Sequence, residues 1–146
     1  MPTPYLIVSS ASKAIDFYSS AFDAIELVRL ETPDGKIAHA EIQVFGSTVM
    51  LADEYPEMGY KSPATLQGSP VSLYLQVPDA DITQAKAVGA GAKEMMAVSD
   101  QFDGDRRGTV VDPFGHIWLL AAKKETISYA AMRERFTKLV GGASDA

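Results

Sequence analysis

Three polar residues, His39, Glu41 and Gln43, alternate with apolar residues along one predicted strand. Because successive side chains of a strand point to opposite faces, these three share one face, and Ala40 and Ile42 share the other. An imidazole and a carboxylate two residues apart can ligate a metal ion or transfer protons. A single strand supplies too few ligands for a metal, however, and a hydrogen-bonded polar cluster can also simply shape a pocket. We therefore expect the three residues to line a ligand-binding cleft, with no catalytic residue assigned.

Apolar and aromatic residues are expected on the same concave surface. If the strand register holds, Met and aromatic side chains dominate this lining, and such a surface suits a flat organic ligand. The residues concerned are Tyr5, Met50, Tyr74, Ile117 and Leu119.

Two arginines, Arg106 and Arg107, precede the last predicted hairpin, and alternation directs one of them toward the pocket mouth. A guanidinium there could clamp a carboxylate or pair with Glu41, whereas the alternative is a solvated surface arginine. We include Arg106 among the candidate binding residues.

Several other classes of site have no support in the sequence. The chain has no cysteine, which excludes disulfides, thiolate metal sites and cysteine nucleophiles. Gly89-Ala90-Gly91 follows a predicted helix instead of opening one, so no phosphate-binding loop is indicated, and no hydrolase triad pattern is present. A net charge of −6 disfavours nucleic acid as a partner. No apolar run is long enough for a membrane span and no signal peptide precedes the first strand, so we expect a cytoplasmic protein.

The order of predicted elements repeats, with strand, helix and three strands occurring twice in a single domain. The first module, about residues 1–56, has strands near 3–8, 25–30, 36–44 and 48–52, with a helix that begins at Ser9 or Ser10. A Pro- and Gly-containing linker covers about 57–69. The second module, about 70–122, has strands near 71–77 and 93–98, a helix from Asp79 or Asp81 to Gly89, and a final hairpin.

The final hairpin turns at residues 112–115, between two apolar runs. We expect Trp118 to pack beneath a helix, His116 to stabilise the hairpin by a hydrogen bond, and Phe114 to act as a hydrophobic plug. A C-terminal amphipathic helix follows at about 127–141 and is predicted to end at Gly141-Gly142. The sequence thus predicts an α+β fold, two βαβββ modules whose curled mixed sheets surround a cleft.

Motifs along nearly the whole chain resemble the vicinal oxygen chelate superfamily, and in particular its PhnB-like glyoxalase/bleomycin-resistance proteins. The resemblance rests on residues 14–18 with Phe22, on 39–41, on 100–102 with 104–106, and on 112–116 with Trp118. It implies the glyoxalase/bleomycin resistance/dihydroxybiphenyl dioxygenase fold and a homodimer.

The resemblance also implies where metal ligands would stand, on the cavity faces of the first and last strand of each module. Those positions fall near Thr3, Met50, Ser72 and Leu119, none of which is His, Asp or Glu. We therefore expect no metal and no cofactor, and a cleft that binds a small aromatic or cationic molecule. The alternative is a metal-dependent lyase, isomerase or dioxygenase with a rearranged site that uses His39 and Glu41.

Overall fold

The computed structural model describes residues 1–144, and its first half forms a four-stranded sheet. The strand order is β1-β4-β3-β2, with β1 parallel to β4 and the other neighbours antiparallel. The elements of this N-terminal sheet and its helix are β1 (Tyr5–Val8), α1 (Ala11–Phe22), β2 (Ile25–Glu31), β3 (Ile37–Val44) and β4 (Ser47–Asp53).

The second half repeats this topology as a C-terminal sheet with the order β5-β8-β7-β6. Two short helical turns precede it, η1 (Pro56–Met58) and α2 (Pro63–Leu66). Its elements are β5 (Ser72–Gln76), α3 (Ala80–Gly89), β6 (Lys93–Asp100), β7 (Asp105–Val111) and β8 (Ile117–Lys123). The predicted α+β fold with two βαβββ units is therefore confirmed.

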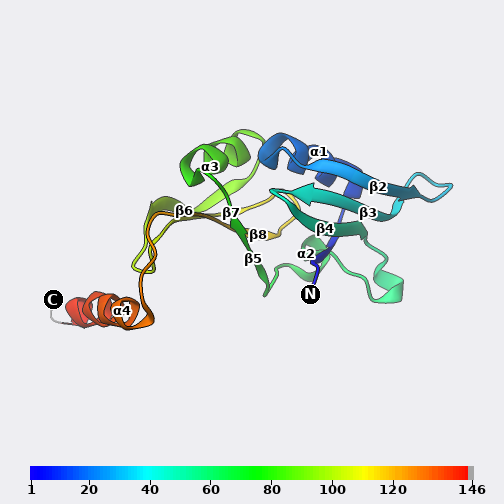
Figure 1. Ribbon diagram of the computed structural model, residues 1–146. Coiled ribbons are helices and arrows are strands. Elements are labelled where there is room, and N and C mark those ends of the chain that lie inside the picture. The colour runs from blue at the N-terminus through cyan, green and yellow to red at the C-terminus, as the bar shows by residue number, and fades with distance from the viewer. Residues whose placement is uncertain (145–146) are drawn as a thin grey trace.

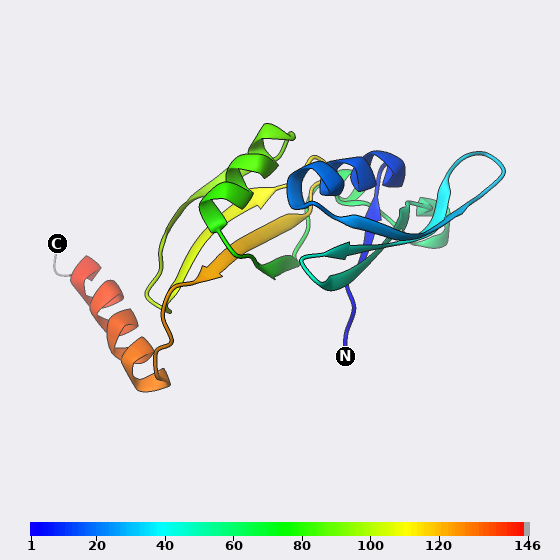
Figure 2. The ribbon, with the colours of Figure 1, turned by 45° about the horizontal axis from the view of Figure 1, so that its top comes forward.

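Both sheets carry their helix on the same side, and α1 packs against α3 (Figure 1). Within residues 1–144, the opposite faces of the two sheets have no long helix packed over them (Figure 2), and only the short helical turn of residues 63–66 contacts β1, at the edge of the first sheet. We call these two surfaces the open faces. The two sheets do not close into a barrel, so the chain presents two open faces instead of one enclosed cavity.

Side-chain caps fix where the two covering helices begin. Ser10 accepts a hydrogen bond from the backbone N–H of Lys13, and Asp79 accepts one from Ile82 at 3.0 Å. Each cap satisfies a backbone donor that the first turn of a helix leaves free. Of the two predicted start positions for each helix, the structure selects Ser10 and Asp79.

The core is centred on aromatic side chains where the two halves meet. Phe17, Tyr18 and Phe22 of α1 pack against Phe114 and Trp118 of the last hairpin, with ring centroids 5.0–6.5 Å apart. Trp118 is fully buried and Phe114 nearly so, which confirms the core positions predicted for both. The aromatic cluster therefore ties the first helix to the C-terminal sheet.

A buried carboxylate, Asp112, organises the turn of that hairpin. Its Oδ1 accepts hydrogen bonds from the backbone N–H of Phe114 at 2.9 Å and of His116 at 3.0 Å. Its Oδ2 accepts from the Tyr18 hydroxyl at 2.5 Å and from Trp118 Nε1 at 2.9 Å. The His116 ring lies 3.0 Å from the carbonyl oxygen of Ile7, so it is a structural hydrogen-bond partner as predicted, but it joins the two halves instead of bonding within the hairpin.

The last helix, α4 (Tyr129–Ser144), stands away from the rest of the protein (Figures 1 and 2). The prediction that it ends at Gly141-Gly142 is wrong, because the helix continues to Ser144. Glycine permits a positive φ but does not enforce one, and here the backbone stays helical. Among residues 1–144, no helix combines the length and the apolar character that crossing a membrane requires.

Candidate functional site

A hydrogen-bonded chain of three side chains crosses the open face of the N-terminal sheet. The Tyr5 hydroxyl lies 2.9 Å from His39 Nδ1, and His39 Nε2 lies 2.9 Å from Glu41 Oε2. An ionised carboxylate can only accept hydrogen bonds, so His39 donates from Nε2, and in a neutral imidazole Nδ1 then accepts from the Tyr5 hydroxyl. This arrangement leaves the Tyr5 oxygen and the second Glu41 oxygen as acceptors toward solvent.

The strand ladder explains why these residues meet. Tyr5 pairs with Met50 across β1 and β4, and Met50 pairs with Glu41 across β4 and β3. Tyr5 remains 47% exposed, whereas His39 and Glu41 are each about a quarter exposed. Burial, followed by the neighbouring Tyr60 and Glu41, raises the pKa of Tyr5, so its phenol stays protonated at neutral pH. Gln43 lies on the same face and is also half-buried, but it makes no hydrogen bond within this chain of side chains.

The open face of the C-terminal sheet carries a second polar cluster around Tyr74. The Tyr74 hydroxyl donates to Asp105 Oδ2, and Arg107 Nη1 donates to both Asp103 and Asp105 at 2.8 Å. Burial, then the hydrogen bond to and the charge of Asp105, raise the pKa of Tyr74 to about 12. Tyr74 is half exposed and pairs with Leu119 across β5 and β8.

The assignment of Arg106 to the cleft needs correction. Its guanidinium lies on the α3 side of the sheet, where it pairs with Asp81 at 2.7 Å and Asp100 at 3.1 Å. Arg107, one residue later, points to the open face. The two arginines point to opposite faces of the sheet, as alternation predicts, but which of them lies on the open face depends on the β7 register, which the sequence leaves undetermined.

Tyr5 and Tyr74 occupy matching positions in the two sheets. Each lies on the first strand of its half, beside an apolar residue of the last strand, Met50 or Leu119. These four residues are therefore the lateral neighbours on the open faces, whereas Thr3 precedes β1 and Ser72 pairs with Ile117. The expected positions shift by two residues in β1 and β5.

This set of side chains does not fit a divalent metal. Two protonated phenols, a thioether and an isobutyl group offer none of the imidazole or carboxylate donors that zinc, nickel or iron sites use. Among residues 1–144, no group of three or more His, Cys, Asp and Glu could hold a metal ion. His39 and Glu41 bond to each other, so they are a pair and not a complete ligand set.

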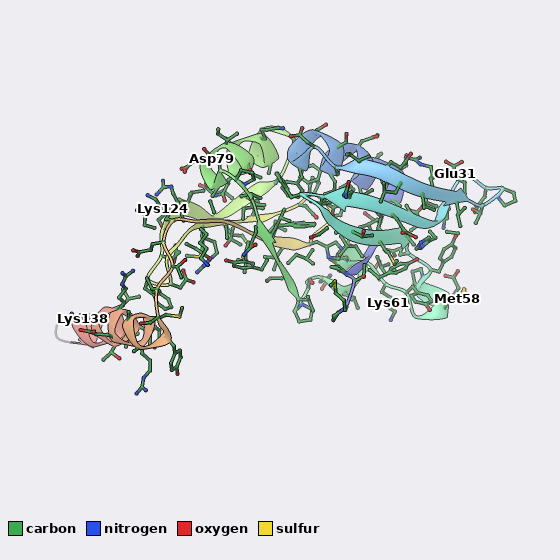
Figure 3. The ribbon with its side chains drawn as sticks, viewed as in Figure 1. Glu31, Met58, Lys61, Asp79, Lys124 and Lys138 are labelled. Atoms are coloured by element: carbon green, nitrogen blue, oxygen red, sulfur yellow. The ribbon has the colours of Figure 1, made fainter. Side chains whose placement is uncertain are left out.

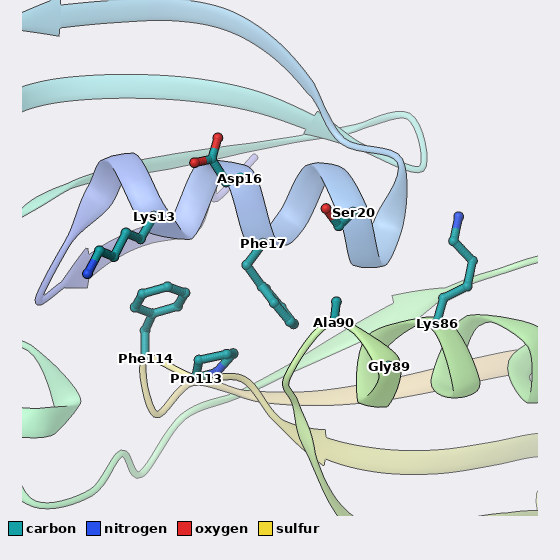
Figure 4. Close-up of a pocket in the computed structure, with 9 residues that line it drawn as sticks. All are labelled: Lys13, Asp16, Phe17, Ser20, Lys86, Gly89, Ala90, Pro113 and Phe114. Atoms are coloured by element: carbon teal, nitrogen blue, oxygen red, sulfur yellow. The ribbon is translucent and has the colours of Figure 1, made fainter.

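Two surface hollows differ in their relation to these clusters. One has a volume of about 280 Å³ and is bordered by Tyr5, His116 and apolar residues of the 61–73 segment, at the edge where the two sheets approach each other. The other is a wide groove between α1 and α3 on the covered side, bordered by Lys13, Asp16 and Lys86 (Figure 4). Of the two, only the first adjoins an open face.

Sequence reasoning missed the acidic part of the second cluster. Asp103, Asp105 and Arg107 are spaced by two residues, the signal of a shared strand face, but Asp103 precedes the first residue of β7. The Tyr5–His39 hydrogen bond was also missed, because it joins strands 34 residues apart and depends on the β1–β4–β3 order.

Comparison with known proteins places this geometry in a family. The sequence model of the Glyoxalase/Bleomycin resistance protein/Dioxygenase superfamily matches residues 3–120. An uncharacterized protein of Mycobacterium tuberculosis is 50% identical over 121 residues, which cover 81% of this chain and 71% of that protein. An uncharacterized protein of Arabidopsis thaliana is 35% identical over 122 residues, which cover 79% of this chain and 73% of that protein.

Solved structures agree with the fold. The Arabidopsis thaliana protein At5g48480 has a TM-score of 0.66 at 31% identity, covering 83% of this chain and 97% of its own. The FosX fosfomycin resistance protein of Listeria monocytogenes, solved with Mn(II), has a TM-score of 0.66 at 14% identity, covering 93% and 96%. The latter shows a shared fold alone. The chain belongs to the Glyoxalase/Bleomycin resistance protein/Dioxygenase superfamily.

Proposed function

We propose that the protein binds a small aromatic cation on its open faces, in a cleft that a second copy of the chain completes. The observation that carries this proposal is the matched pair of tyrosines, Tyr5 and Tyr74, each half exposed and each hydrogen-bonded into a cluster that contains carboxylates. An exposed phenol ring can stack on a flat ligand and attract a positive charge at its face.

The charge of each cluster favours a cation. The N-terminal cluster contains the Glu41 carboxylate, and in the C-terminal cluster Asp103 and Asp105 exceed the single charge of Arg107 by one. The oxygen atoms of Tyr5 and Glu41 that face solvent accept hydrogen bonds, so a ligand with N–H donors suits them. An anion would meet a surface of like charge.

A second copy is part of the proposal because neither open face encloses a ligand by itself. Small-molecule sites commonly bury most of the ligand surface in a concave pocket. The half-buried apolar side chains beside the tyrosines, Met50, Ile117 and Leu119, supply surface that a facing copy would cover.

Calorimetric titration tests this function with ethidium as a planar aromatic cation and 3,8-diamino-6-phenylphenanthridine, the same ring system without the N-ethyl group and its charge, as the neutral control. We expect saturable ethidium binding that weakens with added salt, because screening reduces the attraction between unlike charges. The neutral control should bind at least about tenfold more weakly, a difference of about 1.4 kcal/mol. Equal binding of the two compounds, or no binding of ethidium, would contradict the proposal.

The alternative, a metal-dependent enzyme built around His39 and Glu41, is tested by elemental analysis of protein purified without chelator. Stoichiometric metal that disappears when His39 is changed to Ala would favour the enzyme. The donor set described above for residues 1–144 supports the metal-free binding protein instead.

A further inference from the structure

The last helix, α4, carries an apolar stripe that residues 1–144 leave largely uncovered. Tyr129, Phe136, Leu139 and Val140 are each 48–75% exposed, and Met132 lies on the same side. At 100° per residue these five positions share one face of the helix. An isolated helix of 16 residues is only marginally stable in water, and packing of an apolar face is what normally stabilises one.

The start of α4 is fixed to its own chain so that the helix points outward. The backbone N–H groups of Lys124 and Glu125 both donate to the carbonyl oxygen of Gly104, which ties the chain to the β6–β7 turn. Only residues 126–128 then remain before the helix begins. Figure 3 shows Lys124 where β8 leaves the sheet and Lys138 on the distant helix.

Two contacts hold this orientation. The rings of Phe102 and Phe136 lie 5.4 Å apart, and Arg135 pairs with Glu125. Phe102, in the β6–β7 turn, and Glu125, just after β8, lie at the chain exit, the place where the chain leaves the C-terminal sheet, and not on an open face. Phe136 is thus the stripe residue that meets its own chain, whereas Tyr129, Leu139 and Val140 remain exposed and available to a second molecule.

The charge and the length of α4 favour a second copy of this chain as the molecule that covers the stripe. Residues 129–144 carry three basic and one acidic side chain, whereas residues 1–128 carry ten basic and seventeen acidic ones. By helical spacing, Arg133 and Arg135 flank the stripe, while Glu134 and Lys138 pair with each other on the far side. A basic-edged apolar helix complements the acidic body of the same protein.

An open face has the dimensions and chemistry of such a partner. A helix of 16 residues is about 24 Å long, and strands β6, β7 and β8, with seven or eight residues each, span about 23–26 Å. The C-terminal open face combines half-buried apolar residues with the Asp103 and Asp105 carboxylates. The opposite face of this sheet is covered by α3, whereas no long helix within the described part of the same chain covers the open face.

We propose that α4 of one copy packs across the C-terminal open face of a second copy, so that each subunit supplies a wall of the other's ligand site. This inference rests on the proposed function for the ligand, but not for the contact between the copies. The helix lies beyond residues 3–120, the part that matches the superfamily. The contact is therefore a feature of this chain's own C-terminal segment.

Sedimentation equilibrium of the full chain tests the contact. The double substitution Leu139→Glu and Val140→Glu, which keeps the Phe102–Phe136 contact, should weaken dimerisation at least about tenfold, because it places two carboxylates in an apolar interface beside an acidic surface. The matched control, Glu134→Gln with Lys138→Gln, changes two charged residues on the far side of the same helix and should leave the dimer unchanged. Tryptophan emission from buried Trp118 verifies that both variants are folded.

A second measurement locates the contact. Because the chain has no cysteine, Thr137→Cys gives a single site on α4 for a nitroxide label. When this labelled variant is mixed with isotope-labelled wild-type protein, the nitroxide should broaden amide signals of β7 and β8 and spare those of α1.

Three results would overturn the inference: a monomeric wild-type protein, a double variant (Leu139→Glu with Val140→Glu) that dimerises normally, or broadening confined to α1 and α3. Sedimentation of the monomer with anionic vesicles would likewise point to a membrane as the partner of α4. If the dimer depends on α4 but ethidium does not bind, only the ligand proposal fails. If ethidium binds and the substitutions in α4 leave dimerisation unchanged, only this inference fails.

Discussion

Tyr18 donates its hydroxyl proton to Asp112 at 2.5 Å, and this buried hydrogen bond joins the first helix to the last hairpin across 94 residues of sequence. Burial, then the charge of and hydrogen bond to Asp112, raise the pKa of Tyr18 well above its ordinary value. Because Trp118 and two backbone amides also donate to Asp112, one carboxylate satisfies four donors at the junction of the two halves.

Asp112→Asn should destabilise the fold by about 2–5 kcal/mol, because the amide nitrogen cannot accept and leaves buried donors unpaired. Tyr18→Phe, which removes one donor and keeps the carboxylate, should cost about 1.5–3 kcal/mol, the usual contribution of a hydrogen bond to a charged group. Urea unfolding followed by Trp118 fluorescence measures both values. If Asp112→Asn were no less stable than Tyr18→Phe, the four hydrogen bonds that Asp112 accepts would not be the source of the stability.

Tyr74 should make the protein less stable in alkaline solution. Its folded pKa of about 12 exceeds the ordinary value of 10.0, so the unfolded chain loses this proton first. The stabilising contribution is therefore complete below pH 10 and is lost as the pH rises toward 12. The difference in tyrosinate absorbance between the wild-type protein and Tyr74→Phe, followed against pH, measures the titration of Tyr74. Asp105→Asn should lower this pKa, and an unchanged titration would exclude Asp105 as a cause.

The two neighbouring arginines should affect cation binding differently. Arg107→Gln removes the positive charge beside Asp103 and Asp105, so ethidium should bind roughly threefold more tightly at low salt, equivalent to about 0.6 kcal/mol. Arg106→Gln is the matched control, because Arg106 pairs with Asp81 and Asp100 on the α3 side. Tighter binding in both variants would indicate a general charge effect, and weaker binding in Arg107→Gln would mean that this arginine contacts the ligand.

Gly104→Ala should destabilise the chain exit more than an ordinary glycine substitution. Gly104 has φ +93°, and a Cβ there would lie 2.6 Å from the Glu125 carbonyl oxygen. Gly35, with φ +84° and open space around it, is the control and should lose only about 1–2 kcal/mol from its backbone conformation. Urea unfolding compares the two variants. Equal losses would mean that the chain exit is not closely packed.

The repeated βαβββ order could be predicted because each element has a strong local signal. The α1 stripe recurs at helical spacing, and Ser10 and Asp79 are good N-caps. Alternation likewise placed Trp118 in the core and His39 with Glu41 on one face. These features depend on neighbours a few residues apart.

The contacts between strands could not be predicted with the same certainty. A register change of one residue moves a side chain to the other face, which is why the sequence alone does not distinguish Arg106 from Arg107 as the arginine of the open face. The pairing of Tyr5 with Met50 and of Tyr74 with Leu119 depends on parallel ladders between strands some 45 residues apart. The outward direction of α4 depends on the hydrogen bonds at Gly104, for which the sequence has no signal.

The role of the paired tyrosines is tested most directly by titrating ethidium into three full-chain variants, Tyr5→Ala, Tyr74→Ala and Tyr55→Ala. Tyr55 is the control, because its ring already carries the Lys36 ammonium group 5.2 Å from its centroid and it belongs to neither cluster. Loss of ring stacking and cation–π attraction should weaken binding about fivefold to thirtyfold in each of the first two variants, equivalent to about 1–2 kcal/mol. Unchanged affinity for Tyr5→Ala and Tyr74→Ala, or an equal loss for all three, would contradict the assignment of the site to the open faces.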